Sequence, residues 1–230
     1  MTFRRSLLCL LSGLLVLLLL APGSAEAKCS DPPRPGVDWS KCDKNKKMLR
    51  GDNLRGGRFE KTDLSASDLS GARLSGAVLV RANLMRSILR RANLEEADLA
   101  NVQAGRASFE SAVLVRAVLT KAELPRADFT RADLTGANLS KADLERAVLA
   151  DATLDGAKLS YADLARADLR GAALAGADVT GAYLYLTRIE GSDLSGVLGL
   201  TQWQVDVACG DGDTKLPEGL SRPPDWPCGD

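Results

Sequence analysis

The chain repeats a five-residue pattern over most of its length. From Leu54 to Leu194, every fifth position carries a large apolar side chain, with Ala104 as the one exception. Leu fills 23 of these 29 positions, and a small residue, Ala in 21 of the units, stands two residues before. The residue between them is often Asp or Asn, as in the Ala-Asp-Leu segment 132–134. A pattern this regular restricts the chain to very few architectures.

A period of five excludes a regular helix and a flat strand. An α-helix advances about 100° per residue, so leucines five apart would spread over every face. A strand alternates its faces at each residue, so successive leucines would point to opposite sides. A chain that turns a corner every five residues brings each leucine back to the same interior. Such a chain buries a continuous core only when its coils stack, so we expect a solenoid.

The pattern Ala-(Asp/Asn)-Leu followed by two variable residues resembles that of the pentapeptide-repeat proteins. The resemblance covers about residues 50–198, and Ala keeps the small position in 16 consecutive units from Ala107 to Ala182. It implies an all-β fold, a right-handed quadrilateral β-helix with four repeats per coil. The 29 repeats then form about seven coils, and stacking at about 4.8 Å gives a rod about 35 Å long.

One unit departs from the pattern. In the segment Val102-Gln103-Ala104 the small and the large position are exchanged. We interpret this as a volume-conserving swap, which protein cores tolerate well. A local bulge in the coil is the alternative.

Residues 1–27 are expected to be a secretory signal peptide. Arg4 and Arg5 precede an apolar run at 7–21, and the small-x-small segment 25–27 resembles a cleavage site. Without this leader the chain keeps 28 basic and 29 acidic residues of the original 30 each. No other stretch is apolar enough to span a bilayer. We therefore expect a periplasmic or secreted protein without a transmembrane segment.

Four cysteines lie outside the leader. Cys29 and Cys42 precede the repeats, and Cys209 and Cys228 follow them. A disulfide needs Cα atoms within about 7 Å, whereas the two ends of the rod lie about 35 Å apart. The predicted disulfides are therefore Cys29–Cys42 and Cys209–Cys228. A zinc site is the alternative, but the ligands would be split between the ends, the chain has no His, and exported compartments are oxidising.

Both ends of the rod need covers, because an open β-solenoid edge presents unpaired backbone groups. We predict a disulfide-bridged N-terminal cap at 28–48, in which Trp39 covers the first coil. The β-helix is expected at 49–199, and a C-terminal cap at 200–230.

The C-terminal cap is expected to be a short helix followed by a Pro-rich strap. Thr201 and Gln204 fit a capping box at the start of a helix. One face of this helix would then carry Leu200, Trp203 and Val207. We expect both Trp203 and Trp226 to pack within the cap, and a ligand platform is the alternative.

The sequence offers little for catalysis. Histidine, the commonest general base and metal ligand, is absent. The abundant carboxylates, such as Asp128, Asp133 and Asp143, recur at one repeat position that the fold itself explains. We expect no catalytic, cofactor-binding or metal site, no cofactor, and a protein that is not an enzyme.

The twenty-residue coil stacks one basic column on the rod. Five arginines recur twenty residues apart and should lie about 5 Å from one another; they are Arg86, Arg106, Arg126, Arg146 and Arg166. One interpretation is that neighbouring acids such as Asp143, Asp163, Asp128 and Asp168 screen them. The other is a linear anion-binding stripe, since Arg suits phosphate and carboxylate recognition.

These features favour a non-catalytic exported solenoid that acts as an interaction or structural scaffold in the cell envelope. Its partner would be an unknown protein or an anionic envelope component, and no nucleic acid is expected. The alternative comes from the resemblance, because some pentapeptide-repeat proteins mimic DNA and protect topoisomerases. That role needs a strongly acidic surface, which the near-zero charge and the arginine column oppose. With both ends capped, we expect a monomer rather than a dimer.

Overall fold

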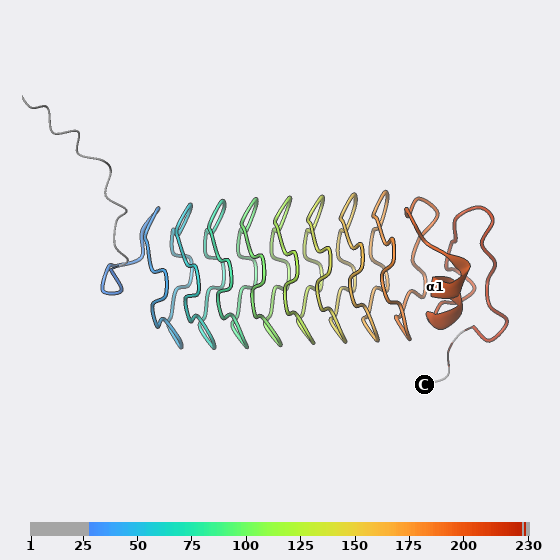
Figure 1. Cartoon of the computed structure of the whole chain (residues 1–230), viewed down its shortest axis with the longest axis horizontal. Helices are drawn as coiled ribbons and strands as arrows, with labels where there is room; N and C mark the ends of the chain where they lie inside the picture. The colour runs from blue at the N-terminus through green and yellow to red at the C-terminus, as the bar shows by residue number, and fades with distance from the viewer. Residues whose placement is uncertain (1–27, 227, 229–230) are drawn as a thin grey trace, which may run out of the picture.

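The computed structural model describes residues 28–226 and 228, and these form a rod of stacked coils (Figure 1). The predicted signal peptide, 1–27, lies outside the described residues. Within the described part, the only helix is α1, Gln202–Val207, at one end of the rod. None of the helices in this part is both long and apolar enough to cross a membrane.

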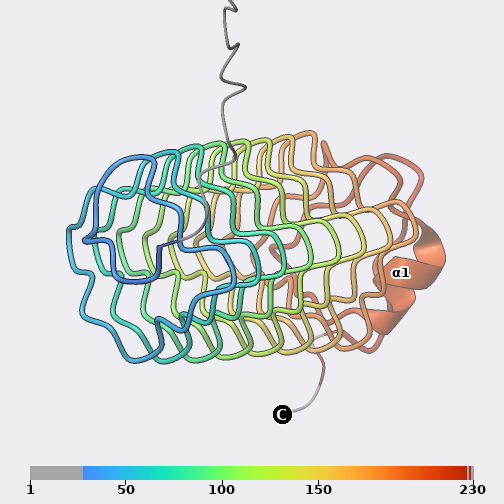
Figure 2. The ribbon, with the colours of Figure 1, turned by 60° about the vertical axis from the view of Figure 1, so that its left-hand side comes forward.

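Successive coils are joined by parallel β-bridges between residues twenty positions apart, as in Asn83↔Gln103 and Gln103↔Glu123. Each side of a coil contributes an isolated bridge rather than a longer strand. The fold is the right-handed quadrilateral β-helix that the sequence predicts, and its coils nest behind one another in Figure 2. The units from Leu54 to Leu194 account for about seven coils, and residues 36–53 add a coil before them.

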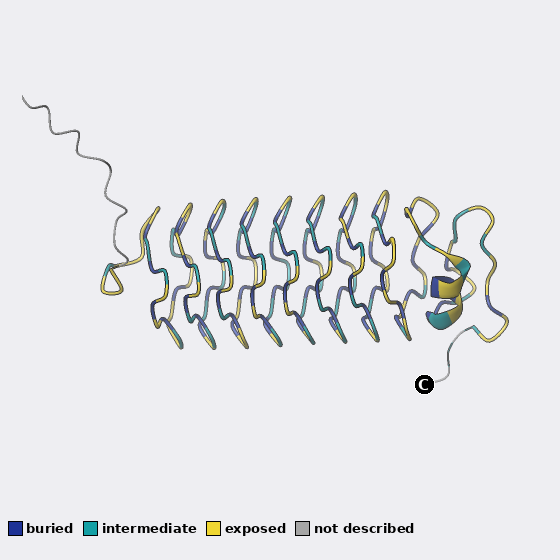
Figure 3. Cartoon of the chain, in the orientation of Figure 1, coloured by how far each residue is buried: buried dark blue, intermediate teal, exposed yellow. Residues whose placement is uncertain are grey.

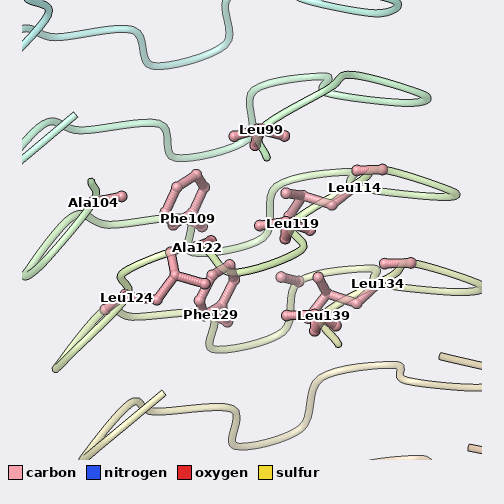
Figure 4. Close-up of a cluster of buried hydrophobic side chains, with 14 of the residues drawn as sticks. Leu99, Ala104, Phe109, Leu114, Leu119, Ala122, Leu124, Phe129, Leu134 and Leu139 are labelled. Atoms are coloured by element: carbon pink, nitrogen blue, oxygen red, sulfur yellow. The ribbon is translucent and has the colours of Figure 1, made fainter. Parts of the chain in front are cut away.

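The interior of the rod is built from the two repeat positions that the pattern singles out. From Leu54 to Leu194 the Leu positions are all buried, and so are the small positions except the half-buried Asp52, while the residues between and after them face outward (Figure 3). Phe109 and Phe129 occupy Leu positions in adjacent coils, and their rings stack at 4.7 Å with an interplanar angle of 4° (Figure 4). Side chains of one column therefore pack on one another along the axis.

The exchanged unit is a swap and not a bulge. Val102 and Ala104 are both fully buried. Gln103 keeps its bridges to residues twenty before and twenty after it, so no extra residue enters the coil. Figure 4 shows Ala104 beside the larger Phe109.

Each corner depends on a residue with positive φ two places after the core residue. At Gly71, φ is 66°, and the turn closes through the Ala72 N–H, which donates to the Leu69 carbonyl at 2.9 Å. Glycine suits this conformation, and other L-residues lose about 1–2 kcal/mol there. Nevertheless 21 non-Gly residues of the described part of the chain adopt it. Their N–H groups donate to the next coil, as that of Arg91 does to the Glu110 carbonyl at 3.0 Å, and these hydrogen bonds offset the strain.

The recurring Asp and Asn side chains hold the turns. Asp133 Oδ1 accepts the N–H of Thr135 at 3.0 Å and its hydroxyl at 2.6 Å. Asn138 makes the same pair of contacts with Ser140. Short polar side chains are favoured where they bond the backbone two residues on. The fold thus explains these residues without catalysis.

The coils begin before the predicted boundary at residue 49. Asp38 already pairs with Arg58 in the parallel pattern, and Trp39 occupies a Leu position with its ring edge-on to Phe59 at 5.8 Å. Trp39 thus lies inside the first coil, where it also covers the coil that follows.

Lys44 takes the next Leu position, and its side chain closes the N-terminal end. Lys44 is only 8% exposed, and its Nζ lies 3.9 Å from the centroid of the Trp39 ring. Nζ also donates to the Cys29 carbonyl at 2.6 Å. Burial, and then the charge of Lys47, lower the pKa of Lys44 below its usual value. Cys29 is joined to Cys42 with Cα atoms 5.5 Å apart, the pairing that the sequence predicts.

At the other end, α1 lies over the last coils, and residues of its first turn hold it there. Thr201 is the N-cap, and with Gln204 it forms the predicted capping box. Gln204 is buried, and its Nε2 donates to the Val179 and Ala182 carbonyls, both at 2.9 Å. Cys209 is joined to Cys228 with Cα atoms 5.3 Å apart, again as predicted.

The two tryptophans of this cap differ, which corrects the prediction that both pack within it. Trp226 does pack, because its indole N–H donates to the Ala208 carbonyl at 2.8 Å and its ring lies against Gly210. Trp203 is 57% exposed. The buried residues of α1 are Gln204 and Val205, because the helix turns Gln204 toward the solenoid-end carbonyls.

Shortening one core leucine tests the packed interior. Leu134→Ala should lower the free energy of unfolding by about 2–5 kcal/mol because it leaves a cavity, whereas Lys121→Ala at an exposed corner should change it by less than about 0.5 kcal/mol. Leu134→Asp should prevent folding, since it buries an unpaired carboxylate. Denaturant unfolding followed by circular dichroism measures these effects. Equal stability of the Leu134→Ala and Lys121→Ala proteins would contradict the buried core.

Gln204→Leu tests the C-terminal closure. The change keeps the side-chain volume but leaves the Val179 and Ala182 carbonyls without their donor, so stability should fall by about 1–3 kcal/mol. Gln202→Leu at a half-buried position of α1 is the control, and its loss should be smaller because water reaches its partners Asp206 and Ser221 and can replace its bonds. Thermal unfolding of the two variants compares them, and equal losses would be inconsistent with this role of Gln204.

Asp193 makes the last coil sensitive to acid. Hydrogen bonds from Ser195 and then from Lys215 hold the pKa of Asp193 at about 2, below its usual 3.8. A carboxyl whose folded pKa is depressed stabilises the protein above its unfolded pKa, and this contribution is lost as pH falls from about 4 to about 2. The difference in Tm between wild type and Asp193→Asn should therefore shrink over that range. Asp213→Asn is the control, and its Tm difference from wild type should not change in this way. A Tm difference between wild type and Asp193→Asn that stays constant over this pH range would refute this assignment.

Candidate functional site: the arginine column

The five predicted arginines occupy one corner of five successive coils. Each has positive φ and an exposed side chain. Their backbones are fixed by the stack: the Arg106 N–H donates to the Pro125 carbonyl at 3.0 Å, and the Arg126 N–H to the Glu145 carbonyl at 2.9 Å. We name this set, Arg86, Arg106, Arg126, Arg146 and Arg166, the arginine column.

Most of the arginine column lacks an ion-pair partner among the described residues. Only Arg146 has a carboxylate within 4.0 Å there, with its Nε 3.6 Å from Glu145 Oε1. Arg166 instead lies 6.0 Å from the centroid of the Tyr185 ring. The guanidinium groups therefore remain available to an outside ligand.

The acids that were expected to screen the column are engaged elsewhere. Asp143 and Asp163 accept the N–H groups of Glu145 and Ala165 at 3.0 and 2.9 Å. Likewise, Asp128 accepts from Thr130. Asp168 pairs with Arg170 at 2.6 Å. Burial raises the pKa of Asp168, but the hydrogen bonds and charge of Arg170 together outweigh it, so the pKa lies below its usual value. These acids reduce the local potential, but the structure does not bring them into contact with the arginine column.

A shallow hollow of about 340 Å³ accompanies the column over three coils. It is lined by Met85, Arg86, Gly105, Arg106, Pro125 and Arg126. Gly105 leaves its floor open beside Pro125, whose ring atoms would lie 3.5 Å from a side chain at that position. Three guanidinium groups thus border an apolar floor.

A second basic corner was not predicted from the sequence. Lys61, Arg81, Lys121 and Lys141 follow the same twenty-residue register one corner earlier in each coil, with Asn101 between Arg81 and Lys121, and they also have positive φ. We name the side of the rod between this corner and the arginine column the basic face. The same stacking rule that found the arginine column would have found this one.

A larger hollow on another corner is less suited to an anion. Its volume is about 600 Å³, and its lining includes Arg50, Arg90, Arg91 and the carboxylate of Glu110. Arg50 lies 2.6 Å from Asp68, and Arg90 lies 3.3 Å from Glu110. Because two of its three arginines are already paired and Glu110 lines the same hollow, the arginine column is the better candidate.

Nothing in residues 28–226 and 228 assembles a metal centre, because no group of three or more His, Cys, Asp or Glu side chains there could hold an ion. The four cysteines of this part are all in disulfides.

Comparison with solved structures places the fold among known solenoids. QnrB1, a plasmid-mediated fluoroquinolone resistance protein, is 21% identical over 80% of this chain and 91% of its own, with a TM-score of 0.57. HetL, a pentapeptide repeat protein involved in heterocyst differentiation regulation in the cyanobacterium Nostoc sp. strain PCC 7120, is 34% identical over 80% of this chain and 85% of its own, with a TM-score of 0.36. A pentapeptide repeat protein from the Arabidopsis thaliana thylakoid lumen is 29% identical over 64% of this chain and 79% of its own, with a TM-score of 0.29.

No curated protein matches the chain. The family model described as pentapeptide repeats (8 copies) matches a series of overlapping segments from residue 49 to residue 198. These segments cover more than half of the chain and coincide with the coils of the rod. The chain therefore belongs to the pentapeptide-repeat family.

Proposed function

We propose that this protein is a non-catalytic exported solenoid that serves as a scaffold for an anionic partner in the cell envelope. The observation that carries the proposal is the arginine column, which aligns exposed guanidinium groups beside an apolar hollow. Only Arg146 of the column has an ion-pair partner among the described residues.

The spacing of the column favours a ligand that carries several negative charges in a line. Neighbouring unit charges about 5 Å apart repel by about 0.8 kcal/mol in water. An extended anion along the column relieves several of these repulsions at once. The planar guanidinium group also binds carboxylates and phosphates through two parallel hydrogen bonds.

A binding role agrees with how the chain uses its reactive groups. The recurring carboxylates accept hydrogen bonds from turns, as Asp133 does from Thr135, and the described cysteines are in disulfides. Repeat solenoids characteristically use their long regular surfaces for recognition.

Export is supported by two independent features. The disulfides Cys29–Cys42 and Cys209–Cys228 are typical of oxidising compartments. The sequence of residues 1–27 has the basic, apolar and small-residue regions of a secretory leader. Both ends of the rod are covered, by Lys44 at one end and Gln204 at the other, which supports a monomer.

The alternative, a DNA-mimicking inhibitor, receives no support from the basic face. A mimic of DNA must be acidic along its length, whereas the two corners of this face carry lysines and arginines. The likeness to QnrB1 shows the fold alone.

Removing charge from the hollow tests the proposal. The triple variant Arg86→Gln, Arg106→Gln, Arg126→Gln should elute from heparin or phosphocellulose at a clearly lower salt concentration than wild type, because polyanion binding weakens with each lost cation. The circular dichroism spectrum should not change, since all three side chains are exposed.

The matched control removes the same charge from outside the basic face. Arg73→Gln, Arg91→Gln and Lys158→Gln are also exposed and lie on other columns. This control should elute close to wild type. If both triple variants shift equally, retention reflects net charge alone and the arginine column is not a site.

A further inference from the structure

The few aromatic side chains of this chain are unevenly placed. The chain has only three Tyr residues, and all three lie in coils near the C-terminal end of the basic face. Tyr161, Tyr183, Tyr185 and Trp203 are between 41% and 63% exposed. Exposed clusters of large apolar side chains on a soluble protein generally mark a binding surface.

Three of these rings form an ordered row. Tyr183 lies between the other two, 6.1 Å from Tyr185 and 6.2 Å from Trp203 between ring centroids. The interplanar angles are only 10° and 25°, so the rings are close to parallel. We name Tyr185, Tyr183 and Trp203 the aromatic row.

The aromatic row follows the column of Asp143 and Asp163 along the rod, and it lies next to the end of the arginine column. Tyr183 pairs with Asp163 in the coil before it, and the Arg166 guanidinium lies 6.0 Å from the centroid of the Tyr185 ring. At the other corner of the basic face, Lys121 and Lys141 are followed by Tyr161, whose ring occupies the space left by Gly181. Both basic corners of the face therefore lead to exposed tyrosines.

No structural need accounts for the exposure of Trp203. Gln204, not Trp203, bonds the end of the solenoid, and Trp226 packs over Gly210. A short helix could carry a polar residue in place of Trp203 without loss of these contacts. Trp203 instead lies at the surface beside Tyr183, with its ring plane within 25° of that of Tyr183.

We propose that the aromatic row and the arginine column together bind an acidic polysaccharide, whose sugar rings lie on Tyr183 and Trp203 and whose carboxylates or sulfates lie along the arginines. The inference deepens the proposed function, on which it rests, by naming the ligand class. The face of an aromatic ring is electron-rich and attracts the weakly positive C–H groups on the flat side of a sugar. Charge on a linear polymer matches a linear column of cations.

The carboxylates of the basic face determine where the acidic groups of the ligand can lie. Glu123, Asp143 and Asp163 lie along its middle, and Asp163 precedes the aromatic row. Acidic groups of the ligand therefore follow the arginine corner, and only the uncharged faces of the sugars reach Tyr183.

Tryptophan fluorescence tests the proposal on the full protein with both disulfides formed. Trp39 is buried and Trp226 is packed, so a change on titration with polygalacturonate should come from Trp203. The signal should disappear in Trp203→Phe, while affinity measured by co-sedimentation is largely kept. Tyr183→Ala combined with Trp203→Ala should weaken binding about tenfold or more, the scale expected for losing two stacking contacts.

Matched controls distinguish stacking on the aromatic rings from contact with any exposed apolar side chain. Leu198→Ala removes a side chain that is also 57% exposed, but from a different column, and it should leave affinity unchanged. Tyr183→Phe keeps the ring and should bind like wild type. A loss of binding in Leu198→Ala equal to that in the double aromatic variant would overturn the proposal.

Two further polymers decide the ligand class. Polyglutamate carries charge without sugar rings, and it should bind more weakly and without dependence on Tyr183. Single-stranded oligothymidine offers stacking bases and phosphates, and binding tighter than polygalacturonate with the same aromatic dependence would replace the polysaccharide by a nucleic acid. If the arginine triple variant loses polygalacturonate and the aromatic double variant does not, the proposed function stands and this inference fails.

Discussion

The corner conformation is the constraint on which the whole rod depends. At each corner a residue with positive φ donates its N–H to the next coil, as Arg106 does to the Pro125 carbonyl, while the following N–H closes the turn. This geometry alone lets a period of five return Leu side chains to one axis. Because each side contributes only an isolated bridge, the corners and the Leu and Ala interior jointly hold the stack.

Most of the fold follows from the sequence because its determinants are local and periodic. The Leu and Ala positions, the twenty-residue register and the capping box at Thr201 are all visible in short segments. The first coil was not predicted, because Trp39 and Lys44 stand at Leu positions and conceal the repeat. Trp203 was placed wrongly because the orientation of α1 is set by carbonyls of distant coils, which the sequence of the helix does not reveal.

The candidate site was predicted in position but not in its interactions. Adding twenty to each residue number aligns Arg86 through Arg166, yet it cannot show which acids pair with them. Asp143 and Asp163 turn to backbone N–H groups because a turn donor two residues away competes for them. The aromatic row needs Trp203, which lies outside the repeat, so periodicity could not have found it.

The four-sided coil converts distance along the chain into direction around the rod. An insertion of a single pentad between Leu114 and Leu119 would keep every Leu position directed to the axis but rotate all later coils by one side, so that Phe129 would no longer stack on Phe109. Arg126 would then leave the corner that it shares with Arg106 and move to the next one. An insertion of four pentads would instead lengthen the face with its columns in line. The surface of such a molecule can therefore be rearranged or extended by whole units, while its Leu positions stay inside the rod.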